Sequence, residues 1–296
     1  MNHIGEFAAL IAAFAWTSTA MMFETTSRKV GSIPVNLIKL VIAFLLIGCY
    51  TSFSRGCFLP VDATPHAWLW LIISGLLGFV FGDLFLFKSF TIVGARISML
   101  VMTLVPPLTA FIGWAFLREK LTLMNFAGML LVLGGILIVV LSRNEQSNKI
   151  GLNHSLKGIL FAFGGAVGQA TGLVSSKYGM GTYNAIASTQ IRILAGIFGF
   201  AIMVTFLRRW LSIKKAVIDK KAMKMLVIAS ILGPFIGVSL SLYAVQHTST
   251  GIASTLMATV PVLIIAPSVI IYKQKLKLKE VIGAVISVMG IVLFFL

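Results

Sequence analysis

Charged side chains inside long apolar stretches are the residues of this sequence best suited to chemistry. Lys39 and Arg192 each lie well inside such a stretch. An ionised group in a lipid bilayer is costly, so each needs a partner or a function. Both cations could attract a carboxylate or phosphate of a solute. Alternatively, Lys39 could extend to the membrane interface while Arg192 binds free carbonyls at a broken helix.

Asp83 is the one carboxylate that we place well inside an apolar stretch. A proton-coupled carrier usually requires a buried acid whose pKa is raised by desolvation, and Asp83 is the candidate for that role. A salt bridge to Lys88, a little over one helical turn away, or to Arg96 is the alternative. The centre of the first apolar stretch contains no acid, so facilitated diffusion or exchange agrees with the sequence as well as proton coupling does.

Uncharged polar residues add a second set of candidates near residue 240. Four of them recur at i, i+4, i+7 and i+8, which places them on one helical face: Ser239, Tyr243, Gln246 and His247. We expect this face to point into the protein, where it either lines a cavity or makes hydrogen bonds between helices. A lone histidine such as His247 is more often a hydrogen-bonding group than a ligand.

Two prolines interrupt apolar stretches and could act as hinges. Pro106 and Pro261 have no N–H group, so the carbonyls of Met102 and Met257 lose their usual helical partners and the helices can kink. Carbonyls freed beside a cavity could bind a substrate ammonium group. The kinks could equally serve only to shape the helix bundle.

The composition defines the class of protein. Of the 296 residues, 58% are hydrophobic and 11% are charged, whereas soluble domains contain roughly 45–50% and 25%. This excludes a cytosolic enzyme, because a soluble fold of this length needs more polar surface. No HExxH, CxxC, GxSxG or phosphate-binding loop is present, and Cys49 and Cys57 alone cannot form a zinc site. We expect a membrane protein that is not an enzyme and has no cofactor or metal.

A transmembrane helix needs about 20 mostly apolar residues, and the chain contains ten such stretches. They are residues 4–24, 33–51, 67–88, 96–117, 123–141, 156–176, 184–207, 223–246, 251–272 and 279–296. The fold class we predict is therefore all-α integral membrane, with ten transmembrane helices. Helices are favoured over a β-barrel because the apolar runs are continuous.

The loops predict how the chain is oriented. Most lysines and arginines fall in the loops that join odd-numbered to even-numbered stretches, which by the positive-inside rule face the cytoplasm. Both termini are then predicted on the outer side. The basic segment 208–224 lacks the interleaved aromatic residues of a nucleic-acid site. We expect it to attract anionic lipid at the cytoplasmic face and to bind no nucleic acid.

The second half of the chain repeats the first. A shift of 155 residues places Met102 on Met257 and Pro106 on Pro261. A shift of 153 matches the earlier helices, with Lys39 on Arg192 and Trp16 on Gln169. Trp16 and Gln169 either line a cavity or pack in the core. We place the repeats at residues 1–148 and 149–296. Five helices in each force the second copy to insert upside down, which is the symmetry that alternating-access carriers use.

These repeated segments resemble a known family. The run from Val105-Pro106-Pro107 to Leu117-Arg118-Glu119-Lys120-Leu121-Thr122 is similar to the end of an EamA-type repeat of the drug/metabolite transporter superfamily, and the run from Val260-Pro261 to Lys275-Leu276 is its second copy. The resemblance implies a basket of ten helices around a central cavity. One difference is that Gln274 stands where the first copy has Glu119.

The sequence and this resemblance together predict a transporter of small metabolites in the inner membrane. We expect alternating access, with amino acids or similar zwitterionic or anionic solutes as substrates and export as the favoured direction. The candidate substrate-binding residues are Trp16, Lys39, Gln169, Arg192, Ser239, Tyr243 and Gln246. A membrane-embedded scaffold or sensor that binds a small molecule without moving it is the alternative.

Overall fold

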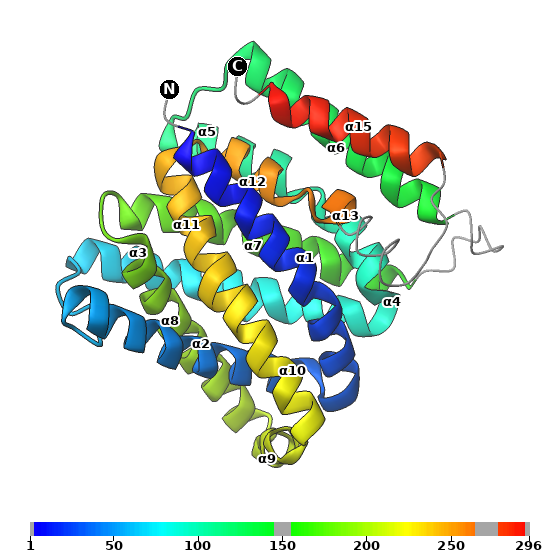
Figure 1. Cartoon of the computed structure of the whole chain (residues 1–296). Helices are drawn as coiled ribbons and strands as arrows, with labels where there is room; N and C mark the ends of the chain where they lie inside the picture. Colours follow the sequence, from blue (N-terminus) through cyan, green and yellow to red (C-terminus); the bar gives the residue numbers. More distant parts are fainter. Residues whose placement is uncertain (1–2, 145–154, 264–277, 294–296) are drawn as a thin grey trace.

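The computed structural model describes residues 3–144, 155–263 and 278–293, and within them all regular structure is helical (Figure 1). The first repeat contributes α1 (Ile4–Val30), α2 (Ser32–Arg55), α3 (Pro65–Gly75), η1 (Leu76–Asp83), α4 (Leu84–Met102), α5 (Val105–Leu117) and α6 (Leu123–Asn144). Local sequence explains several boundaries. The hydroxyl of Thr64 accepts a hydrogen bond from the backbone N–H of Ala67 and Pro65 opens the helix, while Gly56 ends α2 in a left-handed conformation.

In the described residues the second repeat has the same order of elements, except for one added helix and for two helices in the place of α4. It contains α7 (Leu156–Met180), α8 (Ala185–Phe206), α9 (Trp210–Ile218), α10 (Lys220–Ser230), η2 (Ile231–Gly237), α11 (Val238–His247), α12 (Thr250–Met257), α13 (Val260–Leu263) and α15 (Leu278–Val292). Side chains of Asn184, Asp219 and Ser249 cap the first turns of α8, α10 and α12. The added element is α9.

Among the described residues, six helices are long and apolar enough to cross a membrane: Ile4–Val30, Ser32–Arg55, Pro65–Gly94, Leu156–Met180, Ala185–Phe206 and Lys220–His247. Val105–Leu117, Leu123–Ile138 and Val281–Val292 are shorter apolar helices. A multi-pass membrane protein is confirmed. The number ten stays a prediction, because part of the ninth predicted stretch lies outside the described residues.

The repeats share an unusual feature of the backbone. A π-helical segment interrupts the third long helix of each repeat, as η1 and η2, and their first residues, Leu76 and Ile231, are 155 positions apart. Glycines accompany these segments. A Cβ atom on Gly168 of α7 would lie 2.7 Å from the Cα atom of Gly82 in η1, so the two backbones touch. Small residues thus let η1 pack directly on α7.

The first helices of the two repeats run in opposite directions. Thr248 receives a hydrogen bond from Lys177, near the end of α7, and donates one to Glu6, near the start of α1. At the other end of the bundle, neighbouring residues of α4 bond to Arg28, near the end of α1, and to Gly158, near the start of α7. The start of each helix therefore lies beside the end of the other.

The last helices of the repeats, α6 and α15, pack on each other at one edge of the bundle (Figure 1). Gly135 and Gly290 are 155 positions apart, and a side chain on either would collide with the partner helix. Apolar residues such as Leu130 and Val285 remain exposed on this pair, as expected of surfaces that face lipid.

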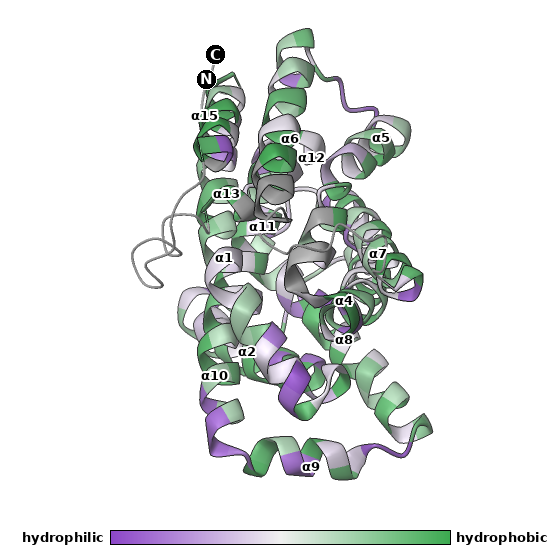
Figure 2. Ribbon diagram, turned by 90° about the vertical axis from the view of Figure 1, so that its right-hand side faces the viewer, coloured by the Kyte–Doolittle hydropathy of each residue, from purple (hydrophilic) through white to green (hydrophobic). Residues whose placement is uncertain are grey.

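The basic segment 208–224 contains the added helix α9, which lies across one end of the bundle (Figure 2). Its apolar side chains Leu211 and Ile218 are exposed, and Lys214 and Lys215 lie between them in the sequence. We expected this segment to be a loop. Its hydrophobic and basic residues together are typical of a helix that lies in the membrane interface.

Candidate functional site

A cavity lies between the two repeats, and both line it with equivalent residues. Trp16 and Gln169 are one such pair at the offset of 153 residues. Five more pairs at the offset of 155 line the cavity: Leu86 and Ser241, Met99 and Ser254, Met102 and Met257, Thr103 and Ala258, Val105 and Val260. The cavity is therefore formed by the same positions of two copies of one fold.

The segments that contain Pro106 and Pro261 both border this cavity. Each is a break between two helices and not a kink within one helix. Before Pro106 the chain leaves α4 at Met102, makes a turn and starts α5 at Val105. Before Pro261 it leaves α12 at Met257 and starts α13 at Val260 in the same way. We expected kinked continuous helices. A proline is favoured in the first turn of a helix, so each Val-Pro pair begins a new helix and the preceding carbonyls end the old one beside the cavity.

Lys39 and Asp83 form a buried ion pair next to the cavity. Lys39 Nζ lies 2.6 Å from Asp83 Oδ2, and the two residues are 4% and 2% exposed. Gln169 of the second repeat donates a hydrogen bond of 2.6 Å to Asp83 Oδ1. The ammonium group also lies 4.2 Å from the ring centroid of Phe87. Asp83 therefore joins both repeats.

The salt bridge between Asp83 and Lys88, one of the alternatives that we considered, was wrong. That residue follows Asp83 by five positions, which on an α-helix turns its side chain by about 140°, and Lys88 is exposed whereas Asp83 is buried. The side chain of Arg96 lies outside the described set. Lys39 pairs with Asp83 because α2 packs on α4, which follows Asp83 directly, and spacing along one helix cannot reveal such a contact.

Arg192 is the charged residue that lines the cavity itself. It is 4% exposed, and its guanidinium carbon lies 5.0 Å from the ring centroid of Phe79, another lining residue. Its Nε atom is buried without a hydrogen-bond partner. Lys39, the equivalent residue of the first repeat, has a carboxylate partner, whereas within the described residues Arg192 has none at ion-pair distance.

Trp16 and Gln169 both line the cavity but differ in their partners. Gln169 donates hydrogen bonds to Asp83 and to the carbonyl of Gly78. The indole Nε1 of Trp16 is buried without a partner, close to Gly237. These positions therefore supply one satisfied amide and one free donor.

The polar residues that we predicted on one face of α11 do not line the cavity. The cavity is lined by Val238 and Ser241 of this helix, and Ser239, Tyr243 and Gln246 are not among its lining residues. Gln246 donates to the carbonyls of Gly181 and Tyr183, in the loop after α7, and Ser239 is buried without a partner. Gln246 thus connects α11 to a loop and does not line the cavity.

Sequence reasoning missed a polar network that closes one end of the bundle. The carboxylate of Glu119, at the end of α5, accepts hydrogen bonds from the backbone N–H of Thr250, at 2.9 Å, and from its hydroxyl, at 2.7 Å. Lys177 of α7 lies 2.8 Å from Glu119 and donates to the carbonyl of Thr248. Glu6 of α1 accepts from the Thr248 hydroxyl. We call Glu6, Glu119, Lys177, Thr248 and Thr250 the outer network.

A second contact between the repeats lies at the same end. The hydroxyl of Tyr183 donates a hydrogen bond of 2.9 Å to Asp62, and Arg55 binds both residues. The hydrogen bond from Tyr183 is the main cause that holds the pKa of Asp62 below its ordinary value, while burial raises the pKa of Tyr183. Asp62 is therefore anionic at neutral pH and keeps this contact closed.

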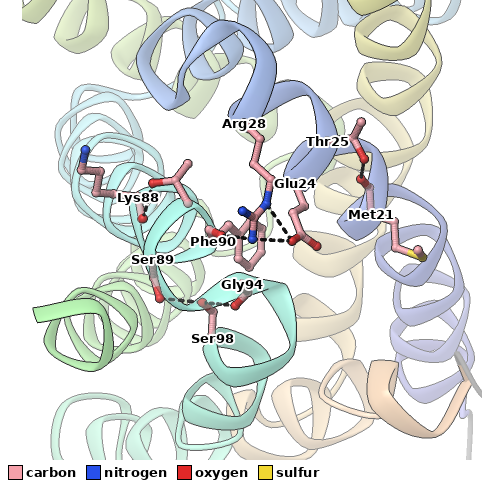
Figure 3. A network of polar contacts seen from close by, with 10 residues as sticks. Met21, Glu24, Thr25, Arg28, Lys88, Ser89, Phe90, Gly94 and Ser98 are labelled. Atoms are coloured by element: carbon pink, nitrogen blue, oxygen red, sulfur yellow. Dashed lines mark hydrogen bonds and ion pairs between the residues drawn. The ribbon is translucent and has the colours of Figure 1, made fainter. Parts of the chain in front are cut away.

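The opposite end of the bundle is held mainly by contacts within the first repeat (Figure 3). Arg28 forms an ion pair with Glu24 on α1 and donates to the carbonyl of Phe90 on α4. Gly94, next to Arg28, has a positive φ of 81°, a conformation that favours glycine and interrupts α4. Lys29 bonds to Asp219 across the repeats, and this bond lowers the pKa of Asp219.

Two related helical bundles around a central cavity define the class as a membrane carrier. A model of the EamA-like transporter family matches residues 3–141 and again residues 156–296. The chain belongs to this family, which is part of the drug/metabolite transporter superfamily, and the resemblance noted in the sequence is confirmed. The boundary that we placed at residue 148 lies between the matched segments and outside the described residues.

Two further comparisons agree with this assignment. An uncharacterised membrane protein of Saccharomyces cerevisiae is 30% identical over 115 residues, which is 38% of this chain and only 27% of that protein. A protein of known crystal structure has the same fold, with a TM-score of 0.73 over 98% of this chain and 95% of the other at 19% identity. That likeness concerns the fold alone.

The buried ion pair leads to a prediction about stability. Asp83→Asn leaves the Lys39 ammonium without a counter-charge, so we expect the free energy of unfolding to fall by about 3–5 kcal/mol. The matched change Asp62→Asn breaks an exposed pair and should cost less than about 1 kcal/mol. Denaturant titration of the purified protein in detergent micelles measures both.

A double variant isolates the interaction between the two charges. Lys39→Met combined with Asp83→Asn removes both charges and should be more stable than either single variant. Equal losses for Asp83→Asn and Asp62→Asn, or strictly additive losses in the double variant, would contradict a strong buried pair.

Proposed function

We propose that this protein moves small metabolites across the inner membrane by alternating access, with amino acids or similar zwitterionic or anionic solutes as substrates. The observation that carries the proposal is the cavity, which equivalent residues of the two repeats line in pairs. If the two copies of one fold exchange their conformations, such a cavity opens first to one side and then to the other. The opposite directions of α1 and α7 support this inverted arrangement.

The outer network supports a state closed at the end that carries the N-terminus. It joins residues of both repeats, so this end cannot open without breaking the bond between Glu119 and Lys177. The repeat places Glu24 at the position equivalent to Lys177, and Gln274 at that equivalent to Glu119. Glu24 and Gln274 cannot form an ion pair, so the other end lacks the same bond. A cavity loaded from that end suits export.

Counterflow in proteoliposomes tests the carrier directly. Vesicles with purified protein and an unlabelled internal solute should accumulate labelled external solute transiently, because a carrier exchanges one for the other. Vesicles without protein are the control. Binding of the solute without any flux would favour a membrane-embedded scaffold or sensor and refute the proposal.

The outer network leads to a prediction about alternating access. In a Cys49→Ser, Cys57→Ser background, Ser241→Cys places one thiol in the cavity. Lys177→Met removes a charge-assisted bond worth about 1.5–3 kcal/mol, so a maleimide that cannot cross membranes should label this thiol roughly tenfold faster from the outer side.

Lys120→Met is the matched control for that experiment, because it removes an exposed cation at the same end of the bundle. Its labelling rate should equal that of the background protein. An unchanged rate in Lys177→Met, or an equal increase in Lys120→Met, would show that the outer network does not control access.

We also propose that both termini face outward and that anionic lipid binds the cytoplasmic end. The lysines of α9 and its exposed apolar residues suit a helix lying on anionic headgroups. Cys57 is exposed in the loop before α3, at the outer end. In a Cys49→Ser variant, the impermeant maleimide should label Cys57 in intact cells; labelling only after permeabilisation would reverse the orientation.

A further inference from the structure

The cavity contains two buried N–H donors without an acceptor, Arg192 Nε and Trp16 Nε1. Buried donors are normally satisfied, so each unsatisfied one requires an explanation. Two serine hydroxyls that line the cavity are satisfied by their own helices, since Ser241 donates to Gly237 and Ser254 to Gly251. The donors of Arg192 and Trp16 have no such partner within the protein.

The charges beside the cavity do not cancel. Lys39 and Asp83 neutralise each other at 2.6 Å, which leaves Arg192 as the uncompensated charge of this group. The stacking of its guanidinium on Phe79 lowers the cost only in part. Because an unpaired charge in a low-dielectric interior is expensive, a ligand with one negative charge is bound more favourably than a neutral one.

Most of the rest of the wall is apolar. Leu86, Leu173 and Val238 contribute branched side chains, and Met99 and Met257 contribute flexible thioethers that adapt to ligand shape. Asp83, the acid nearest to these residues, already receives bonds from Lys39 and Gln169 and is not a lining residue. An ammonium group would therefore meet no free carboxylate here.

We infer that the cavity binds a monovalent organic anion, a carboxylate attached to an apolar aliphatic or aromatic body. The carboxylate lies at Arg192, the N–H of Trp16 supplies a second donor, and the body fills the apolar wall. This inference rests on the proposed function and narrows its substrate class from zwitterions and anions to anions.

A matched series of compounds tests the charge preference. Four compounds share one phenylpropyl skeleton: 3-phenylpropionate is an anion, phenylalanine a zwitterion, 3-phenylpropan-1-ol neutral and 3-phenylpropylamine a cation. Octanoate, octan-1-ol and octylamine repeat the comparison with an aliphatic body. Equilibrium dialysis of the full chain in detergent should show that each carboxylate binds at least about tenfold tighter than the other members of its series.

Variants test the assignment to Arg192. Arg192→Gln should weaken carboxylate binding about tenfold or more and remove the preference for anions. Arg192→Lys should retain the preference with weaker binding, because it keeps the charge without the planar donors. Trp16→Phe should weaken binding a few fold. Lys120→Met, which removes an exposed cation outside the cavity, should bind as the natural protein does. Gel filtration and thermal unfolding show whether each variant is folded.

The outcomes separate this inference from the transport proposal. If phenylalanine binds as tightly as 3-phenylpropionate, if the preference survives in folded Arg192→Gln, or if neither carboxylate binds, the inference is overturned. Counterflow of amino acids in any of these cases would leave the carrier intact. Anion binding that depends on Arg192, without counterflow of the same anion, would instead keep the site and overturn transport.

Discussion

The cost of placing charge in an apolar interior is the constraint on which the centre of this protein depends. Two equivalent cations, Lys39 and Arg192, extend from the second helices of the two repeats, but one acid, Asp83, lies beside them. Asp83 pairs with Lys39 and binds Gln169, so it also holds the repeats together. Arg192 lines the cavity and has no carboxylate partner in the described residues, so its charge is not compensated. The unequal numbers of cations and acids therefore produce a structural contact and leave one unpaired cation at the cavity.

Small departures from the repeat make the two ends of the bundle different. Where the first repeat has Asp83, the second has Val238, so an acid is present on one side of the pseudo-symmetry only. Glu119 likewise has Gln274 as its counterpart. A perfectly symmetric carrier has equal energies in its two states. The ion pair of Glu119 with Lys177 stabilises closure of the end of the bundle that carries the N-terminus, and breaking it is part of the cost of opening that end.

The backbone around the cavity is irregular in the same way in both repeats. The π-helical segments η1 and η2 interrupt one long helix in each, and the breaks after Met102 and Met257 interrupt the next. Irregular backbone at membrane depth is tolerated where it borders a cavity, and π-helical turns are frequent at functional sites. Glycines at the contact of η1 with α7 let the backbones touch, and the crossing becomes narrow enough for Gln169 to reach Asp83.

The sequence by itself determined the membrane class, the duplication and the family, because these follow from hydropathy, spacing and motif. It also identified Trp16, Gln169 and Arg192 as positions inside the bundle, and the structure places all three at the cavity. Only the tertiary structure decided the partners. Lys39 meets Asp83, and Glu119 meets Lys177, through contacts between helices far apart in the chain. Periodicity shows which residues share a face, but the packing of other helices decides what that face meets, and so Ser239, Tyr243 and Gln246 of α11 are not lining residues of the cavity.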